Sequence, residues 1–212
     1  MEHHIEFSFK GRYYSLGEIS NQIEHLWIVC HGQGHLAQYF IRKFRPLDDG
    51  QHLIIAPEGL SKYYLDGQSG RVGATWMTKE NRLIDIENYL DFLERITLEV
   101  LSKLNSKVKI TLFGFPQGAA TISRFATQSS IRFDRLILWS GIFPPDLPPI
   151  KGTERLKDKA IYWVYGNQDP YLTDALYKEQ EEIAKQLNTG IEAVIFDGKH
   201  EIKDEVLTRF LS

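Results

Sequence analysis

The sequence is poor in cysteine. Its 212 residues contain a single one, Cys30, which cannot form a disulfide within the chain. Because disulfides are rare in reducing compartments, we expect a cytoplasmic protein. Cys30 lies inside an apolar run, and this position indicates a small core residue rather than a reactive thiol.

Charge clusters and long hydrophobic runs are also missing. The 25 basic and 28 acidic residues give a net charge of −3, and neither a nucleic-acid-binding face nor a polybasic membrane anchor is expected. The stretch MEHHIEFSFK lacks the features of a signal peptide, and no apolar run is long enough to cross a bilayer. The histidines are scattered, so we expect no metal site and no cofactor.

What the sequence does contain is a series of short apolar, β-branched runs, most of which end in glycine. Continuous runs of this kind are typical of strands buried on both faces of a parallel sheet. They cover residues 25–32, 52–59, 107–114, 134–141, 160–166 and 191–198. Residues 5–18 indicate a further strand, or a hairpin that turns at Lys10-Gly11.

Helical patterns lie between most of these runs. The clearest begins near Thr78 or Asn81, and its apolar residues recur at steps of three and four. Further helices are expected at residues 117–130, 175–187 and 201–211. The alternation predicts an α/β fold with a doubly wound, mainly parallel sheet, helices on both faces and a single domain over residues 1–212.

Two segments interrupt this alternation, and both follow predicted strands at the sheet edge where such folds bind ligands. Residues 58–77 are rich in glycine and aromatics, and residues 141–150 are rich in proline. Their aromatic side chains either line a pocket or cover the sheet edge. The pocket candidates are Tyr63, Tyr64, Trp76 and Phe143.

The stretch LFGFPQGAAT, residues 112–121, has the outline of a nucleophile elbow. In that strand-turn-helix motif, Gly-x-Ser-x-Gly places an attacking hydroxyl on a sharp turn. The middle position here is Pro116. Other pieces of a hydrolytic site follow in the chain order of this fold: a His31-Gly32-Gln33-Gly34 loop, Asp169 after one strand and His200 after the last.

Together these stretches resemble the α/β-hydrolases of the phospholipase/carboxylesterase family, which includes acyl-protein thioesterases. HGQGH, GFPQGAA, GNQDPYL and GKHEI correspond to its oxyanion loop, elbow, acid loop and histidine loop. The resemblance implies that His200 is the base and that Asp169 orients it. It also implies that the N–H groups of Gln33 and Gln117 form the oxyanion hole, and that position 116 is the nucleophile. His31 is a further pocket candidate, or it only hydrogen-bonds its own loop.

Proline at position 116 has two expected consequences. Its ring cannot attack a carbonyl, so no acyl-enzyme can form there. Proline also fixes φ at about −65°, whereas the elbow residue of this family ordinarily has a positive φ. We therefore expect the turn to relax into an unstrained start of the following helix, and the Gln117 N–H to leave its oxyanion-hole direction.

Three functions remain open at this point. The leading one is a family member that has lost ester hydrolysis but keeps a pocket for a small ester or acyl ligand, as a monomer or homodimer. The second is an active hydrolase in which Asp169 and His200 activate water or a hydroxyl such as Thr121. The third is an ordinary serine esterase in which Pro116 is an error or an engineered change.

Overall fold

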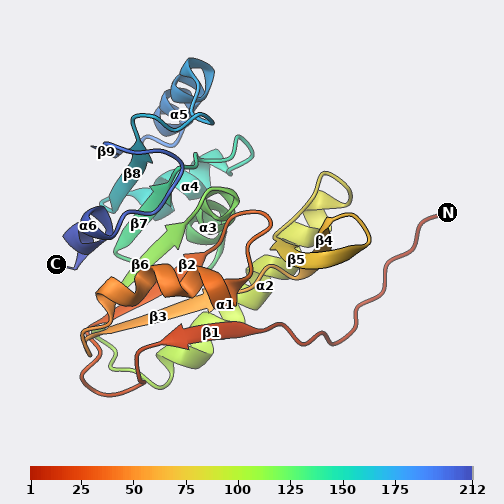
Figure 1. The fold of residues 1–212 in the computed structure, drawn as a ribbon, viewed down its shortest axis with the longest axis horizontal. Helices are drawn as coiled ribbons and strands as arrows, with labels where there is room; N and C mark the ends of the chain where they lie inside the picture. The colour runs from red at the N-terminus through yellow and green to blue at the C-terminus, as the bar shows by residue number, and fades with distance from the viewer. Residues whose placement is uncertain (212) are drawn as a thin grey trace.

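The apolar runs of the sequence become the strands of one seven-stranded sheet in the computed structural model, which describes residues 1–211 (Figure 1). Its strands are β1 (Tyr13–Leu16), β2 (His25–Cys30), β3 (His52–Pro57), β6 (Lys109–Gly114), β7 (Arg135–Trp139), β8 (Ala160–Gly166) and β9 (Glu192–Phe196). Their order across the sheet is β1-β3-β2-β6-β7-β8-β9. Only β1 is antiparallel to its neighbour. The predicted fold class is confirmed.

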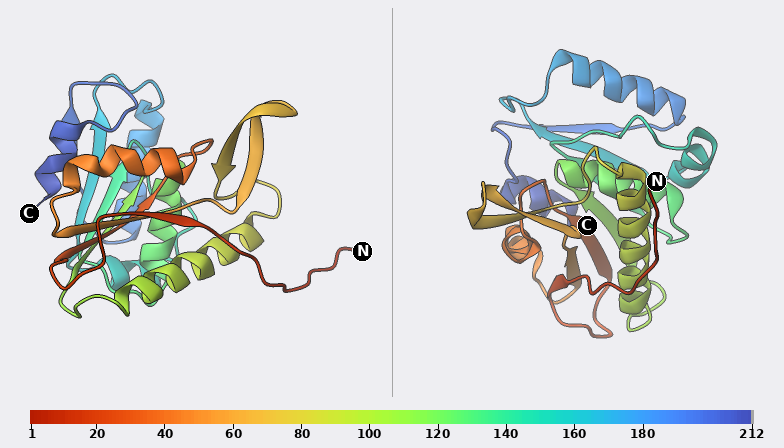
Figure 2. Two further views of the ribbon diagram at one scale, coloured as in Figure 1. Left: turned by 60° about the horizontal axis from the view of Figure 1, so that its bottom comes forward. Right: turned by 90° about the vertical axis from the view of Figure 1, so that its right-hand side faces the viewer.

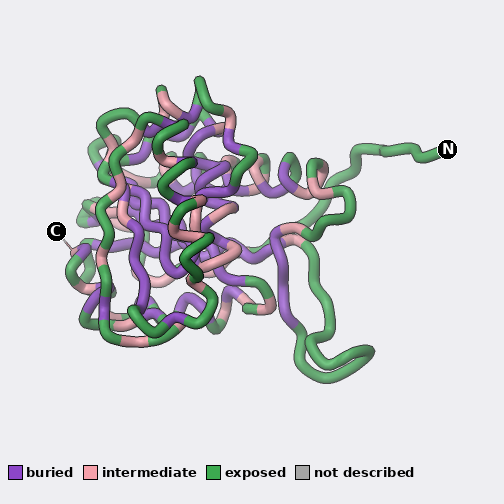
Figure 3. Tube along the Cα trace, turned by 90° about the horizontal axis from the view of Figure 1, so that it is seen from above, coloured by how far each residue is buried: buried purple, intermediate pink, exposed green. Residues whose placement is uncertain are grey.

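Both faces of the central strands β2, β3, β6 and β7 are buried, as their continuous apolar sequences require. Along β2, Leu26 and Ile28 enter one core cluster, whereas Trp27 and Val29 enter the other. The first face is covered by α2 (Arg82–Leu101), α3 (Gln117–Gln128), α4 (Pro149–Leu156) and α5 (Asp174–Gln186). The second is covered by α1 (Ala37–Phe40), the 3-10 helix η1 (Ile41–Leu47), α6 (Asp204–Leu207) and the 3-10 helix η2 (Thr208–Phe210). Figure 2 shows the two helical layers, and Figure 3 shows the buried chain between them.

Residues 58–77, expected to be a long connection, instead contain an antiparallel hairpin. Its strands are β4 (Ser61–Asp66) and β5 (Ser69–Thr75), which form a separate two-stranded sheet. The chain turns at Gly67, whose φ of 89° suits glycine. The hairpin projects from the main body (Figure 2), and most of it is exposed (Figure 3).

Of the two alternatives for residues 5–18, the strand is confirmed as β1, which pairs with β3. No hairpin turns at Lys10-Gly11 within the described residues, and the chain before Gly11 runs away from the body (Figure 1). The last helix begins at Asp204, not at residue 201, and its second half is a 3-10 turn. Residues 201–203 instead lead from the histidine loop into that helix.

Candidate functional site

The turn between β6 and α3 carries Pro116 and has an unstrained backbone. Pro116 lies at the N-cap of α3 with φ −70° and ψ −35°, which is helical. Its carbonyl accepts a hydrogen bond from the Ala119 N–H at 3.0 Å, and the Phe115 carbonyl accepts from Gly118 at 3.1 Å. The expectation of a relaxed start of the helix is therefore confirmed. The direction of the Gln117 N–H stays a prediction.

Glycines allow the strand and the helix to approach closely at this turn. A Cβ on Gly118 would collide with the carbonyl oxygen of Cys30, on β2. A Cβ on Gly114 would collide with the carbonyl oxygen of Gly118. These contacts explain the small residues around the turn, and they depend on the neighbouring backbone rather than on the side chain at position 116.

Asp169 and His200 meet at the same edge of the sheet. Asp169 follows β8 and His200 follows β9, and their side chains hydrogen-bond with a His200 Nδ1 to Asp169 Oδ2 distance of 2.7 Å. The other carboxylate oxygen of Asp169 accepts from the Tyr171 N–H at 3.0 Å. The Asp169 side chain is fully buried and that of His200 is 22% exposed. The carboxylate thus fixes the ring orientation and leaves Nε2 as the free nitrogen, the arrangement of an oriented general base.

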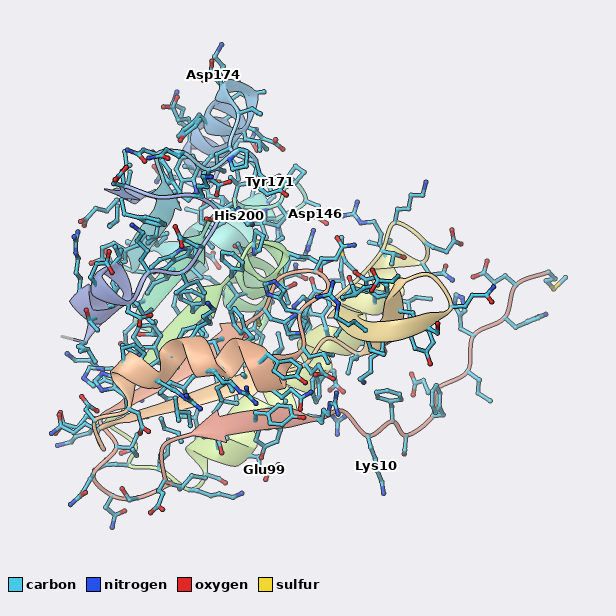
Figure 4. All side chains as sticks on the ribbon, in the orientation of Figure 1. Lys10, Glu99, Asp146, Tyr171, Asp174 and His200 are labelled. Carbon is cyan, nitrogen blue, oxygen red and sulfur yellow. The ribbon has the colours of Figure 1, made fainter. Side chains whose placement is uncertain are left out.

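Aromatic rings hold His200 beside the elbow. Its ring lies 5.0 Å from that of Phe115 and 4.7 Å from that of Tyr171, between centroids. Figure 4 labels Tyr171 and His200 close together near the loops that follow β8 and β9. His35 stacks on Phe115 at 5.8 Å, and burial lowers the pKa of His35, as does the charge of nearby His200. The sequence carried no signal for these contacts beyond the adjacency of Phe115 to Pro116.

The loop that follows β2 lies against the elbow. A Cβ on Gly32 would come within 2.8 Å of the Pro116 Cδ, so the two loops are in contact. Gly34 has a φ of 79°, and its N–H donates to the Ala74 carbonyl of β5 at 2.8 Å. Gly32 is thus the neighbour of Pro116 in space, and Gln33 and Gln117 are the residues that follow Gly32 and Pro116 in sequence. Their roles as oxyanion donors remain predictions.

The side chain of Gln117 ties the first turn of α3 to the chain that leaves the hairpin. Its Oε1 accepts from the Trp76 N–H at 3.1 Å, and its Nε2 donates to the Met77 carbonyl at 3.0 Å. Sequence reasoning considered only the backbone of Gln117 and missed this link. The glutamine in GFPQG was the only available signal.

His31 has a structural role in this site. Its Nε2 accepts from the Gly59 N–H at 3.0 Å, so its Nδ1 carries the proton and donates to the Gly32 carbonyl at 2.8 Å. Burial lowers the pKa of His31 to about 4. The Trp76 indole donates to the His31 carbonyl at 2.9 Å. His31 therefore joins the loops after β2 and β3 as a neutral side chain.

The aromatic pocket candidates fall into two groups. Trp76 and Phe143 are 1% and 0% exposed, so they are core residues, as is His31 at 0%. Their burial favours the alternatives, a covered sheet edge for the two aromatics and a hydrogen-bonded loop for His31, and a pocket role for the three stays a prediction. Tyr63 and Tyr64 are 36% and 49% exposed on the β4–β5 hairpin. The Tyr63 hydroxyl and the Leu65 side chain lie near Gly34, so this part of the hairpin borders the loop after β2.

Within residues 1–211, no group of three or more histidine, cysteine or acidic side chains is arranged to hold a metal ion. None of the helices in this part of the chain is both long and apolar enough to cross a membrane.

Comparisons with known proteins agree with this fold. The family model described as Phospholipase/Carboxylesterase matches residues 18–212. Among solved structures, a carboxylesterase from Mesorhizobium loti superposes with a TM-score of 0.72 at 14% identity, covering 94% of this chain and 91% of that one. Acyl-protein thioesterase 2 from Zea mays superposes with a TM-score of 0.67 at 19% identity, covering 96% and 100%. These identities support the fold alone. No curated protein matches the sequence.

Proposed function

The chain belongs to the phospholipase/carboxylesterase family of α/β-hydrolases, and we propose that it does not hydrolyse esters through an acyl-enzyme. The observation that carries this proposal is Pro116 at the elbow, with its helical φ of −70°. The ring has no group that can attack a carbonyl. In subtilisin, whose triad has the same three residue types, loss of the serine lowers kcat by roughly 10⁶.

A small ester or acyl compound is the ligand that this scaffold favours. Its relatives in the structural comparison include carboxylesterases and an acyl-protein thioesterase. The ring of His200, which Asp169 orients, packs on Phe115 beside position 116, and the loop at Gly32 contacts Pro116. A carbonyl group held there would meet the His200 imidazole, although no covalent bond would form.

The test is hydrolysis of short-chain nitrophenyl esters by the unmodified protein and by Pro116→Ser. We expect no turnover above background for the unmodified protein, and measurable turnover with an acyl-enzyme burst for the variant. Pro116→Ala is the matched control, because it also removes the ring but supplies no hydroxyl. Strong turnover by the unmodified protein that disappears in His200→Ala would refute the proposal.

One observation favours a second function, hydrolysis by directly activated water. His200 remains oriented by Asp169 at 2.7 Å and is partly exposed, so its free nitrogen can take a proton from water. The variant of this idea that uses Thr121 is disfavoured. Its side chain is buried, and its hydroxyl donates to the Gln117 carbonyl at 3.2 Å. Water activation predicts a bell-shaped pH–rate profile that depends on His200 and shows no burst.

The third interpretation, that Pro116 is an error or an engineered change, is settled by resequencing the source gene. A serine codon there would make the chain an ordinary serine esterase. A proline codon leaves the first two functions, which the ester assays separate.

A further inference from the structure

Residues 1–10 form an arm that leaves the body of the protein (Figure 1). The arm carries three large apolar side chains, Ile5, Phe7 and Phe9, which are 89%, 77% and 58% exposed. They alternate with polar residues, and the Phe7 and Phe9 rings meet edge to face at 6.4 Å between centroids. The arm therefore has one apolar side, and exposed apolar surface of this kind is typical of a site that binds another protein chain.

The apolar side of the arm continues the face of β1 that packs on α2. Tyr13 of β1 packs against the core cluster that contains α2, whereas Tyr14 packs against the other cluster. A Cβ on Gly11 would collide with the Phe92 ring of α2, so Gly11 faces this helix as well. Residues two apart in a strand share a face. An extended arm therefore places its odd-numbered residues, which include the three apolar ones, on the same face as Gly11 and Tyr13.

The strand that follows the arm has a free edge. β1 is the first strand in the order β1-β3-β2-β6-β7-β8-β9, and β3 is its neighbour among the described strands. An edge strand of this kind presents backbone N–H and C=O groups that pair with a further strand. A chain that pairs with the arm can therefore continue along β1. The result extends the seven-stranded sheet, whereas an isolated two-stranded ribbon would be only marginally stable in water.

The charges of the arm make it complementary to a second copy of itself. Neither the Glu6 nor the Lys10 side chain has a hydrogen bond or ion pair within residues 1–211, and Lys10 points away from the body (Figure 4). In an antiparallel pair of arms, a two-fold axis at Ser8 places Glu6 opposite Lys10 of the partner subunit. The same axis places Phe7 opposite Phe9 of the partner subunit. Opposite charges and aromatic residues that face each other across strands both stabilise such pairs.

Neighbouring registers fit the arm less well. An axis at position 9 would place Glu6 opposite Arg12 of the partner subunit, but Arg12 already binds the buried Glu58 at 2.6 Å. An axis at position 7 would leave the charges of Glu6 and Lys10 unmatched. An axis at position 6 or 10 would place like charges opposite each other, which is destabilising. A slip by one residue would place apolar side chains opposite polar ones. The charges therefore select the axis at Ser8.

We propose that the arm docks on the arm of a second copy of this chain, as an antiparallel strand pair about a two-fold axis at Ser8. Eight residues of strand then separate position 12 of one copy from position 12 of the other, about 27 Å, so the bodies lie at opposite ends of the pair. Residues 1–3 of each copy run beside the free edge of β1 in the partner subunit. This dimer does not depend on whether the chain hydrolyses esters.

A cysteine at the axis tests the register. Directly opposite residues of an antiparallel pair lie about 4.5–5.5 Å apart between Cα atoms, a separation that a disulfide spans. The native Cys30 is fully buried and does not compete. Under a mild oxidant we expect Ser8→Cys to form a disulfide-linked dimer. The matched control is Ser69→Cys, at the exposed turn of the β4–β5 hairpin, which should remain monomeric under the same conditions.

Charge reversal tests the pairing of Glu6 with Lys10. Glu6→Lys and Lys10→Glu each place like charges opposite each other in a dimer of identical chains. We expect the dimer Kd, measured by sedimentation equilibrium, to rise at least about fivefold for each variant. An equimolar mixture of the two variants should associate as the unmodified protein does, because each arm then faces the opposite charges. The double variant Glu6→Lys/Lys10→Glu should also dimerise normally.

The apolar side is tested by Phe7→Ser. Each copy loses one buried aromatic contact, and we expect the dimer Kd to rise at least about tenfold. Ile150→Ser is the matched control, because Ile150 is an exposed apolar residue on α4, outside the arm. It should leave the dimer Kd unchanged. Since the arm precedes β1, both variants should keep the thermal unfolding midpoint of the unmodified protein.

Three results would overturn the proposal. One is equal cross-linking of Ser8→Cys and Ser69→Cys, or none in either at millimolar protein. Another is a pair of charge-reversed variants whose mixture associates no better than each variant alone. The third is a dimer whose Kd is the same in Phe7→Ser as in the unmodified protein, which would place the interface elsewhere. None of these results affects the ester assays, because those depend on position 116.

Discussion

Substitutions at Pro116 that differ only in backbone freedom test whether the elbow is relaxed. Proline suits the observed φ of −70°, and it limits the unfolded chain. Replacing it with alanine should lower the free energy of unfolding by about 0.4–1 kcal/mol through the unfolded state alone. The ring also contacts Gly32 across the loops, and losing this packing adds to the effect. For a chain of this length, 1 kcal/mol corresponds to roughly 2–4 °C in Tm.

Pro116→Gly gives the decisive comparison. At a helical φ, glycine should cost a further 0.5–1 kcal/mol or so relative to alanine, because it frees the unfolded chain still more. At the positive φ of a strained elbow the order reverses, since glycine alone adopts that region without cost. The assay is urea or thermal unfolding of the three proteins under identical conditions. A glycine variant more stable than the alanine variant would refute the relaxed turn.

Three further predictions concern the framework of the site. Gly118→Ala should lower the free energy of unfolding, measured in urea, by at least about 1–3 kcal/mol, because its Cβ meets the Cys30 carbonyl. The control is Gly190→Ala, whose Cβ meets open space, and equal stability of the two variants would contradict the close approach. Arg124 is buried and binds Asp146 at 2.7 Å, so Arg124→Met should lower the free energy of unfolding by about 1–3 kcal/mol by leaving Asp146 without one partner. Unchanged stability would mean that this ion pair does not hold the loop at Asp146. His31 has a folded pKa of about 4 against an ordinary value near 6.5, so its contribution to stability is fully present above pH 6.5, and about 3 kcal/mol is lost as the pH drops toward 4. The slope of the unfolding free energy against pH should flatten in His31→Gln, and an unchanged slope would assign it to other groups.

Much of the fold was readable because the central strands are buried on both faces. Runs such as residues 25–32 have no polar face, which is typical of a parallel sheet between two helical layers. The edge strand β9 is an exception, since most of it is exposed. The hairpin β4–β5 was missed for the opposite reason. Its strands are exposed on most positions, so the sequence shows neither an apolar run nor a clear alternation there. The first residues gave the opposite error. Ile5, Phe7 and Phe9 alternate with polar residues as in a strand, but they are exposed and lie outside β1.

The candidate site was predictable in its chain order but not in its packing. The order of Gln33, Pro116, Asp169 and His200 located the loops, since parallel strands end at one edge. Burial could not be read from the motif. The sequence around His31 is the same whether its side chain faces a ligand or accepts from the Gly59 N–H. Only the path of the loop after β3 decides between these two arrangements.

The proline ring carries no group that can attack a carbonyl, but the contacts around the elbow do not depend on that ring. The close approach of β2, β6 and α3 rests on Gly114 and Gly118. The first turn of α3 is held by the Gln117 side chain, through the Trp76 N–H and the Met77 carbonyl. His200 is oriented by Asp169 from two other loops. Because none of these contacts uses the side chain of residue 116, Pro116→Ser should fold, and its activity then measures how far the relaxed turn displaces the hydroxyl from the His200 imidazole.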